Sequence, residues 1–161
     1  MKGHILTQGF CVLLFLLGSL SIKAQMPDAI TIIPENATIY DDIILTFDPE
    51  TACYQNGSLA GLSTIAMHSG VTINGTTWQN SVSFNSTGAN GQSPILTSNP
   101  DGTFSIAFNP YEFYGFPAGS NVTQICAVFN NGTDWNQDGR DFLQGGPDCS
   151  DFFIPILTGS P

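Results

Sequence analysis

The chain has 161 residues and a formal net charge of −10, with 13 acidic residues against 3 Lys or Arg. A surface this acidic repels the phosphates of nucleic acids and of anionic membranes, so the composition excludes a nucleic-acid-binding protein. The length is typical of one domain.

The N-terminal 24 residues have the organisation of a secretory signal peptide. Lys2 and His4 precede an apolar run from Phe10 to Gly18, and small and polar residues follow up to Ala24. The run is too short to cross a bilayer as a mature anchor, and no later run is long enough, which predicts no membrane insertion. Removal of residues 1–24 leaves 137 residues, in which one cation, Arg140, stands against all 13 acidic residues, a net charge of −12. We therefore expect a protein that is secreted, extracellular or exposed on the cell surface.

Short runs rich in β-branched residues follow, and no stretch keeps the 3.6-residue apolar period of a helix. In the run 103–108, Phe104, Ile106 and Phe108 alternate onto one face, directly after the turn signal Asn99-Pro-Asp-Gly102. The predicted strands are 29–33, 43–47, 64–68, 71–73, 82–84, 95–97, 103–108, 122–129 and 152–157. They indicate an all-β fold over residues 25–157, an immunoglobulin-like antiparallel β-sandwich of about seven to nine strands. Residues 158–161 have the composition of a linker, which leaves room for a downstream domain.

Three cysteines follow the signal peptide: Cys53, Cys126 and Cys149. In an oxidising compartment two of them are expected to form a disulfide and one to remain free. Cys126 lies in the apolar, strand-like run 122–129, where an ordinary buried thiol fits. The other two lie in loop-like contexts, which favours the pair Cys53–Cys149, although the sequence alone leaves all three pairings open.

The segment Asp134-Trp-Asn-Gln-Asp-Gly-Arg-Asp141 places oxygen ligands at alternating positions before a turn-forming glycine. Calcium prefers such sets of carboxylate and amide oxygens, so the segment predicts a calcium site. The expected ligands are Asp134, Asn136, Asp138 and Asp141. A standard EF-hand is excluded, because Gly145 stands where that loop needs a bidentate acid. The alternative is a polar surface turn whose Asn and Asp side chains cap their own backbone, and Arg140 is expected to pair with one of the acids and weaken an ion site.

Aromatic residues gather in Asn109-Pro-Tyr-Glu-Phe-Tyr-Gly-Phe-Pro117, and two tryptophans lie elsewhere. Aromatic faces stack on the apolar faces of sugar rings, so an exposed set of them indicates a carbohydrate platform. Phe113 and Phe116 are expected to point into the core, and both tyrosines of the segment to point outward. Trp135 lies in a loop and is the stronger candidate for exposed stacking. The predicted ligand-binding residues are Tyr111, Tyr114, Trp135 and Trp78.

Patterns typical of zinc binding or of catalysis are missing from the sequence. His68 is the only histidine after residue 24, and the cysteines lack paired spacing, so a zinc site has too few partners. No nucleophile-elbow motif accompanies His68, which is expected to make a structural hydrogen bond at a strand end. A pair of glycosidase-type carboxylates is formally possible among 13 acids, but nothing marks such a pair. We therefore expect no enzyme activity, and a small hydrolase is the least favoured function.

Several segments, taken in order, carry a resemblance to a known family. They are Ile32-Ile-Pro-Glu35, Asp42-Ile-Ile-Leu-Thr-Phe-Asp48, Leu59-Ala-Gly-Leu62, Met67-His-Ser-Gly-Val71 with Trp78, Ala127-Val-Phe-Asn-Asn131, Asp138-Gly-Arg-Asp141 and Asp151-Phe-Phe-Ile-Pro155. Together they resemble the N-terminal immunoglobulin-like modules of secreted bacterial amylases and glycan-processing surface proteins. The resemblance extends from Ala29 to Ile156. The chain departs from the pattern by an insertion, Gly132-Thr-Asp-Trp135, and by its three cysteines.

The resemblance implies an immunoglobulin-like sandwich that binds carbohydrate or spaces modules beside a catalytic or sorting domain. The first hypothesis is a non-catalytic accessory module for a polysaccharide such as an α-glucan, or for a cell-surface glycan, with a calcium-stabilised loop that presents Trp135. The second is a structural or surface-assembly domain whose exposed strand edges contact a protein partner. A fold alone does not choose between them.

Overall fold

The computed structural model describes residues 26–142 and 148–159. The expected signal peptide, residues 1–24, lies outside these ranges, as do Gly145 and the last two residues of the expected linker. Within the described ranges, no helix is long and apolar enough to cross a membrane.

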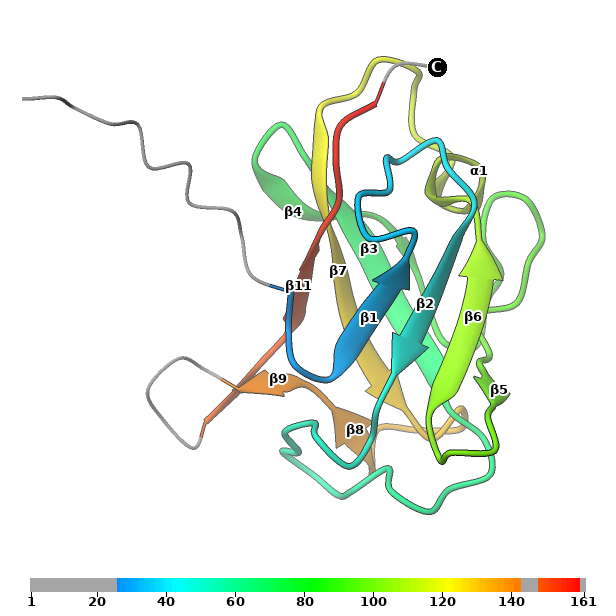
Figure 1. The fold of residues 1–161 in the computed structure, drawn as a ribbon, viewed down its shortest axis with the longest axis vertical. Coiled ribbons are helices and arrows are strands. Elements are labelled where there is room, and N and C mark those ends of the chain that lie inside the picture. Colours follow the sequence, from blue (N-terminus) through cyan, green and yellow to red (C-terminus); the bar gives the residue numbers. More distant parts are fainter. Residues whose placement is uncertain (1–25, 143–147, 160–161) are drawn as a thin grey trace, which may run out of the picture.

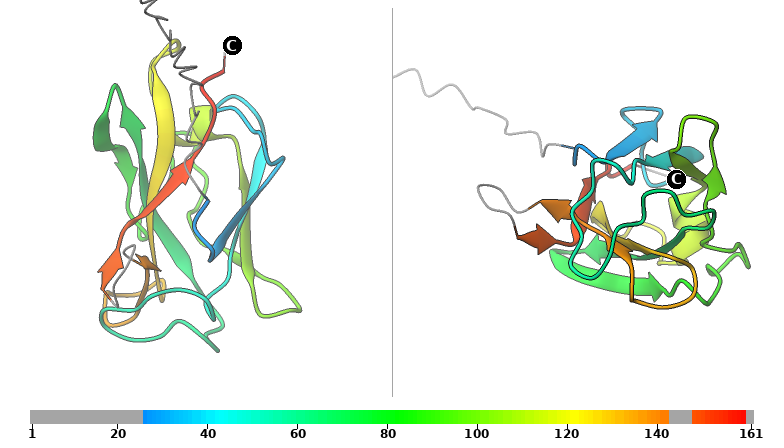
Figure 2. Two further views of the ribbon diagram at one scale, coloured as in Figure 1. Left: turned by 60° about the vertical axis from the view of Figure 1, so that its left-hand side comes forward. Right: turned by 90° about the horizontal axis from the view of Figure 1, so that it is seen from below.

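Antiparallel strands make up almost all of the regular structure, which is all-β and sandwich-like (Figure 1). A four-stranded sheet has the order β1-β2-β6-β5, and a five-stranded sheet has the order β11-β7-β3-β4 with the short β8 paired to β7. A small third sheet consists of β9 and β10. The strands are β1 (Ile30–Ile33), β2 (Ile43–Phe47), β3 (Ala66–Ile73), β4 (Thr76–Val82), β5 (Thr97–Ser98), β6 (Phe104–Phe108), β7 (Val122–Asn130), β8 (Asp138–Gly139), β9 (Asp141–Phe142), β10 (Cys149–Ser150) and β11 (Phe152–Pro155). Figure 2 shows the two larger sheets as stacked layers.

The core lies between these two layers. β2 and β6 alternate strictly between buried and more exposed residues, as the sequence predicts for β6, and turn their buried faces toward the other sheet. Phe47 of β2 stacks on Phe129 of β7 with ring centroids 4.1 Å apart. Phe152 of β11 meets both rings edge-on, at 6.0 and 5.6 Å. Burial of this apolar area between the sheets is the main force that holds the layers together.

Three predicted strands differ from the observed ones for local reasons. The predicted strands 64–68 and 71–73 are one strand, β3, because Ser69 and Gly70 between them stay paired with β7. The predicted strand 82–84 is wrong, since Val82 ends β4 instead. β4 was missed because most of its residues are exposed and polar, so that its sequence carries no apolar alternation.

A short helix, α1 (Pro110–Tyr114), occupies the aromatic segment, where no helix was predicted. The side chain of Asn109 accepts a hydrogen bond from the N–H of Glu112 and caps its start, and Pro110 suits the first turn. Gly115 ends the helix in the left-handed conformation, at φ 64°. Capping residues thus produce one helical turn in a sequence with no helical period.

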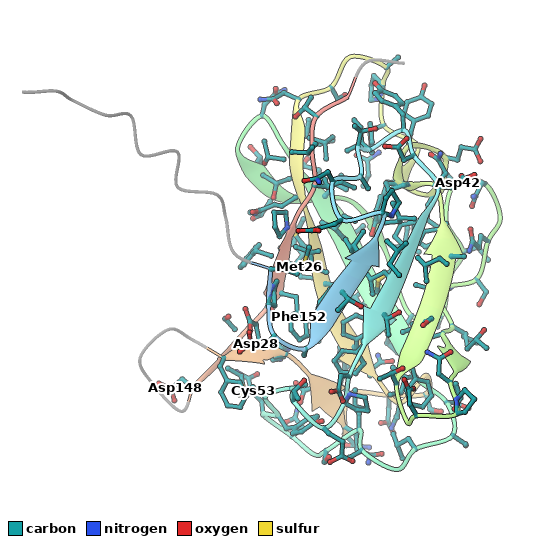
Figure 3. The ribbon with its side chains drawn as sticks, in the orientation of Figure 1. Met26, Asp28, Asp42, Cys53, Asp148 and Phe152 are labelled. Atoms are coloured by element: carbon teal, nitrogen blue, oxygen red, sulfur yellow. A yellow bond between two sulfur atoms is a disulfide. The ribbon has the colours of Figure 1, made fainter. Side chains whose placement is uncertain are left out.

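Cys53 and Cys149 form a disulfide, which confirms the favoured pair, and Cys126 is a free, buried thiol as predicted. The bond joins residues 96 positions apart, with Cα atoms separated by 5.6 Å. Cys53 also exchanges two backbone hydrogen bonds with Arg140, of 2.9 and 2.8 Å. The loop after β2 is therefore fastened to the segment between β8 and β9, at the end of the molecule where Figure 3 labels Cys53 and Asp148.

Candidate functional site

The outer face of the five-stranded sheet is covered rather than open to solvent. On this face His68 of β3 lies opposite Val128 of β7, and Gly70 lies opposite Cys126. Val128, Gly70 and Cys126 are buried, although the outer face of a sandwich sheet normally contacts water. Another part of the chain must therefore lie over them.

The covering segment is β4, which bends over the sheet. Two of its non-glycine residues have left-handed backbone angles, Trp78 at φ 59° and Asn80 at φ 50°, and its register with β3 shifts twice. A Cβ atom added to Gly70 would lie 2.9 Å from the carbonyl oxygen of Gln79, so only glycine admits the bent strand this close. The bend turns the Trp78 side chain onto the outer face. Backbone conformations of this kind often occur at functional sites.

Four rings form what we call the aromatic cluster: Trp78, His68, Trp135 and Phe84. The imidazole of His68 stacks on Trp78 with centroids 5.1 Å apart and an interplanar angle of 20°. Trp135 stands nearly perpendicular to His68 at 5.5 Å and to Phe84 at 5.3 Å. Trp135 is 40 % exposed, whereas Trp78 is half-buried. The cluster thus combines a fixed base with one ring that is open to solvent.

A series of charged groups fixes Trp78 from its polar side. The indole Nε1 donates a hydrogen bond to Oδ2 of Asp151 at 3.1 Å. The other carboxylate oxygen of Asp151 pairs with the guanidinium of Arg140, whose Nε donates to Oδ2 of Asp138 at 2.8 Å. Asp138 is fully buried, and its Oδ1 accepts from the backbone N–H groups of Gln55 and Asn56. Every member of this series is therefore satisfied, which a buried charge requires.

His68 sits in the middle of the cluster and has an unusual environment. Its Nδ1 is buried and has no hydrogen-bond partner among the described residues. Burial lowers the pKa of His68, opposed by a hydrogen bond with the backbone of Val82 and by the charge of Asp151. The imidazole is therefore neutral at neutral pH and acts as an apolar ring between the two tryptophans.

Two of the expected calcium ligands, Asp134 and Asn136, lie in a loop held by its own hydrogen bonds, whereas Asp138 lies in β8 and Asp141 in β9. Oδ1 of Asp134 accepts from Nδ2 of Asn131 and from the N–H of Asn136, and Oδ2 accepts from Nδ2 of Asn136. These bonds lower the pKa of Asp134, most of all the one from the Asn136 backbone. Asp141 lies beyond β8, and burial raises its pKa. Both the capping turn and the pairing of Arg140 with one of the acids were foreseen.

Among the described residues, no group of three or more His, Cys, Asp or Glu side chains is arranged to hold a metal ion. Calcium binding by this loop stays a prediction, and it would require Asp138 to exchange the guanidinium of Arg140 for the ion.

The two tyrosines of α1 do not join the aromatic cluster. Tyr114 was expected to point outward, which is wrong: it is 3 % exposed, and its hydroxyl donates to Oγ of Ser69 at 3.0 Å. Tyr111 is half-buried and packs 5.1 Å from Tyr40. Phe113 and Phe116 are buried, as predicted. Figure 1 shows α1 at one end of the molecule and the loop between β7 and β8, which carries Trp135, at the other.

Of the four predicted ligand-binding residues, the fold brings together Trp78 and Trp135 only. No pattern in the sequence places Phe84, Arg140 and Asp151 beside them, and His68 was expected to have a merely structural role. The outward position of His68 on β3 could have been predicted from the inward residues Met67 and Val71 of the same strand. The bend in β4, by contrast, corresponds to no pattern in the sequence. A comparison with protein-family models and a search of curated proteins find no match for this chain.

Proposed function

We propose that the protein is a secreted, non-catalytic carbohydrate-binding module with an immunoglobulin-like fold, and that it holds a polysaccharide such as an α-glucan against Trp135. The observation that carries the proposal is the exposure of Trp135, 40 %, on a base formed by His68, Phe84 and Trp78. A large ring kept exposed by a rigid base is suited to stacking on a sugar ring, because little side-chain entropy is lost on binding.

The polar groups around the rings suit a neutral ligand better than a charged one. Asp134 and Asn136 flank Trp135 in the sequence, and both side chains are held by hydrogen bonds within the loop. Arg140 is already paired with two carboxylates, so it is not free to bind an anionic sugar. The disulfide Cys53–Cys149 supports secretion into an oxidising compartment.

The test is calorimetric titration of the secreted protein with soluble polysaccharides, beginning with α-glucans. Replacing Trp135 by Ala should weaken binding at least about tenfold, equivalent to about 1.4 kcal/mol, and Trp135→Phe should retain part of the affinity. Leu157→Ala is the matched control, since Leu157 is 53 % exposed and has no place in the aromatic cluster. Equal affinity of the wild type and of Trp135→Ala for every glycan that binds would overturn the proposal.

A further inference from the structure

An exposed apolar row crosses the outer face of the four-stranded sheet, on the side of the molecule opposite the aromatic cluster. Ile33 of β1 lies opposite Ile44 of β2, and Ile44 lies opposite Ala107 of β6. Ile33 is 63 % exposed and Ile44 is 44 % exposed. We call these three residues the apolar row. Each exposed aliphatic side chain costs hydration free energy, so a contiguous set of them on one face is a candidate contact surface.

The row lies in a groove with a volume of about 520 Å³. Its polar border comes from three segments of the chain and consists of Asp42, Asn90, Gln92, Asn109 and Glu112. Nδ2 of Asn109 donates to Oδ1 of Asp42, and Nε2 of Gln92 donates to the carbonyl oxygen of Ala107 at 2.6 Å. The border is therefore held in place by hydrogen bonds to the sheet, and Figure 3 shows Asp42 at the start of β2, close to α1.

The border carries two negative charges that the protein does not neutralise. Within residues 26–142 and 148–159, the only ion pairs are those of Arg140 with Asp138 and Asp151. Asp42 and Glu112 therefore remain without a cationic partner, and both lie beside Asn109 at one end of the apolar floor. This combination is complementary to a ligand in which aliphatic and positively charged side chains lie next to each other.

We propose that the groove is a docking site for an extended, aliphatic segment of another protein that carries Lys or Arg next to its aliphatic residues. The three residues of the row lie on adjacent strands, so the row is about 10 Å long, which an extended segment of three to five residues covers. A second copy of this chain fits less well, because a face-to-face pair would bring its Asp42 and Glu112 carboxylates together at a net charge of −10 per chain. A glycan also fits less well, because the row contains no aromatic ring for stacking.

The test uses three synthetic peptides and the amide chemical shifts of the protein in NMR. The probe is acetyl-Lys-Val-Thr-Val-Lys-amide, and the controls replace both Lys by Glu or both Val by Ser. Only the first peptide should shift the amides around the apolar row. If the Ser peptide binds equally well, the attraction is the general one between a polycation and an acidic protein, and the proposal fails. If the first peptide shifts no amides of the row, it fails as well.

Substitutions test whether peptide binding depends on the apolar row or on other exposed aliphatic residues. Ile33→Thr with Ile44→Thr keeps β-branched side chains on both strands, so the sheet should fold, and peptide binding should weaken at least about tenfold. Ile95→Thr is the matched control, because Ile95 is 51 % exposed but does not line the groove, and it should bind like the wild type. Loss of binding in the control, or retained binding in the double variant, would overturn the proposal. Trp135→Ala should leave peptide binding unchanged, which separates this site from the proposed glycan site.

Sedimentation of the free protein completes the test. We expect a monomer at all concentrations, for both the wild type and the double variant. A dimer in the wild type that disappears in the double variant would mean that the groove is occupied by a second copy, which would replace the proposal.

Discussion

The indole Nε1 of Trp78 and the carboxylate of Asp151 meet at 3.1 Å across the outer face of the five-stranded sheet. Trp78 belongs to β4 at one edge of this sheet, and Asp151 directly precedes β11 at the other edge. The contact therefore spans β3 and β7, which explains why Val128 and Cys126 on this face are buried. It also links the ion pairs of Arg140 to the aromatic cluster.

Removing the acceptor should loosen this contact. We expect Asp151→Ala to lower the free energy of unfolding by about 1–2 kcal/mol, because Trp78 loses a hydrogen bond to a charged group and Arg140 loses one partner, both in a half-buried position. The tryptophan fluorescence of the folded protein should shift to longer wavelength as Trp78 becomes more hydrated. Glu35→Ala, at an exposed acid, is the control and should change neither quantity. An unchanged spectrum in Asp151→Ala would show that the hydrogen bond does not position the ring.

The disulfide should account for much of the stability of this small protein. It closes a loop between residues 96 positions apart, for which the chain-entropy relation gives about 4–5 kcal/mol. Replacing Cys53 and Cys149 together by Ala should lower the urea midpoint accordingly. Dithiothreitol should have the same effect on the wild type and no effect on the double variant, which serves as its own control. A wild-type midpoint that dithiothreitol leaves unchanged would contradict this expectation.

Acidification should destabilise the fold through His68. Because burial lowers the pKa of His68, the folded state binds this proton less readily than the unfolded state. The stability contributed by neutral His68 is thus fully present above the unfolded pKa of 6.5 and is lost as the pH falls through the lower folded-state pKa. Urea midpoints should fall as the pH is lowered through 6.5 and below, and His68→Gln should remove part of this dependence.

The contribution of His68 is isolated by subtracting the urea midpoints of His68→Gln from those of the wild type at each pH. Asp141 contributes with the opposite sign, because burial raises its pKa and its contribution is lost as the pH rises. If the urea midpoint changes with pH by the same amount in both proteins, His68 does not control the pH dependence of stability in this range.

Calcium should compete with Arg140 for the carboxylate of Asp138. In the wild type the guanidinium already occupies Oδ2 of Asp138 at 2.8 Å, so added calcium should raise the melting temperature only slightly. Arg140→Gln should lower the melting temperature, because it leaves a buried carboxylate without its cation, and calcium should then restore it by several degrees. Asp134→Asn in the same background should abolish the restoration. If calcium moves the melting temperature of neither protein, this loop binds no calcium.

Local patterns in the sequence were sufficient for the layers of the fold. Alternation in 103–108 placed Phe104, Ile106 and Phe108 on the buried face, because a strand turns successive side chains to opposite sides and only one side can leave water. Loop context was enough to favour the Cys53–Cys149 pair. These features depend on neighbours in the chain or on composition.

The candidate site depends on contacts that no local pattern encodes. Trp78 reaches Asp151 only because β4 bends over Gly70, and Tyr114 is buried only because Asn109 and Gly115 produce one turn of helix that points its hydroxyl at Ser69. The sequence by itself determined that the fold is all-β and which residues of a regularly alternating strand such as 103–108 leave water. The tertiary structure alone decided which side chains meet, because residues such as Trp78 and Asp151, 73 positions apart, are brought together by sheet pairing and by backbone bends whose cost is met elsewhere in the fold.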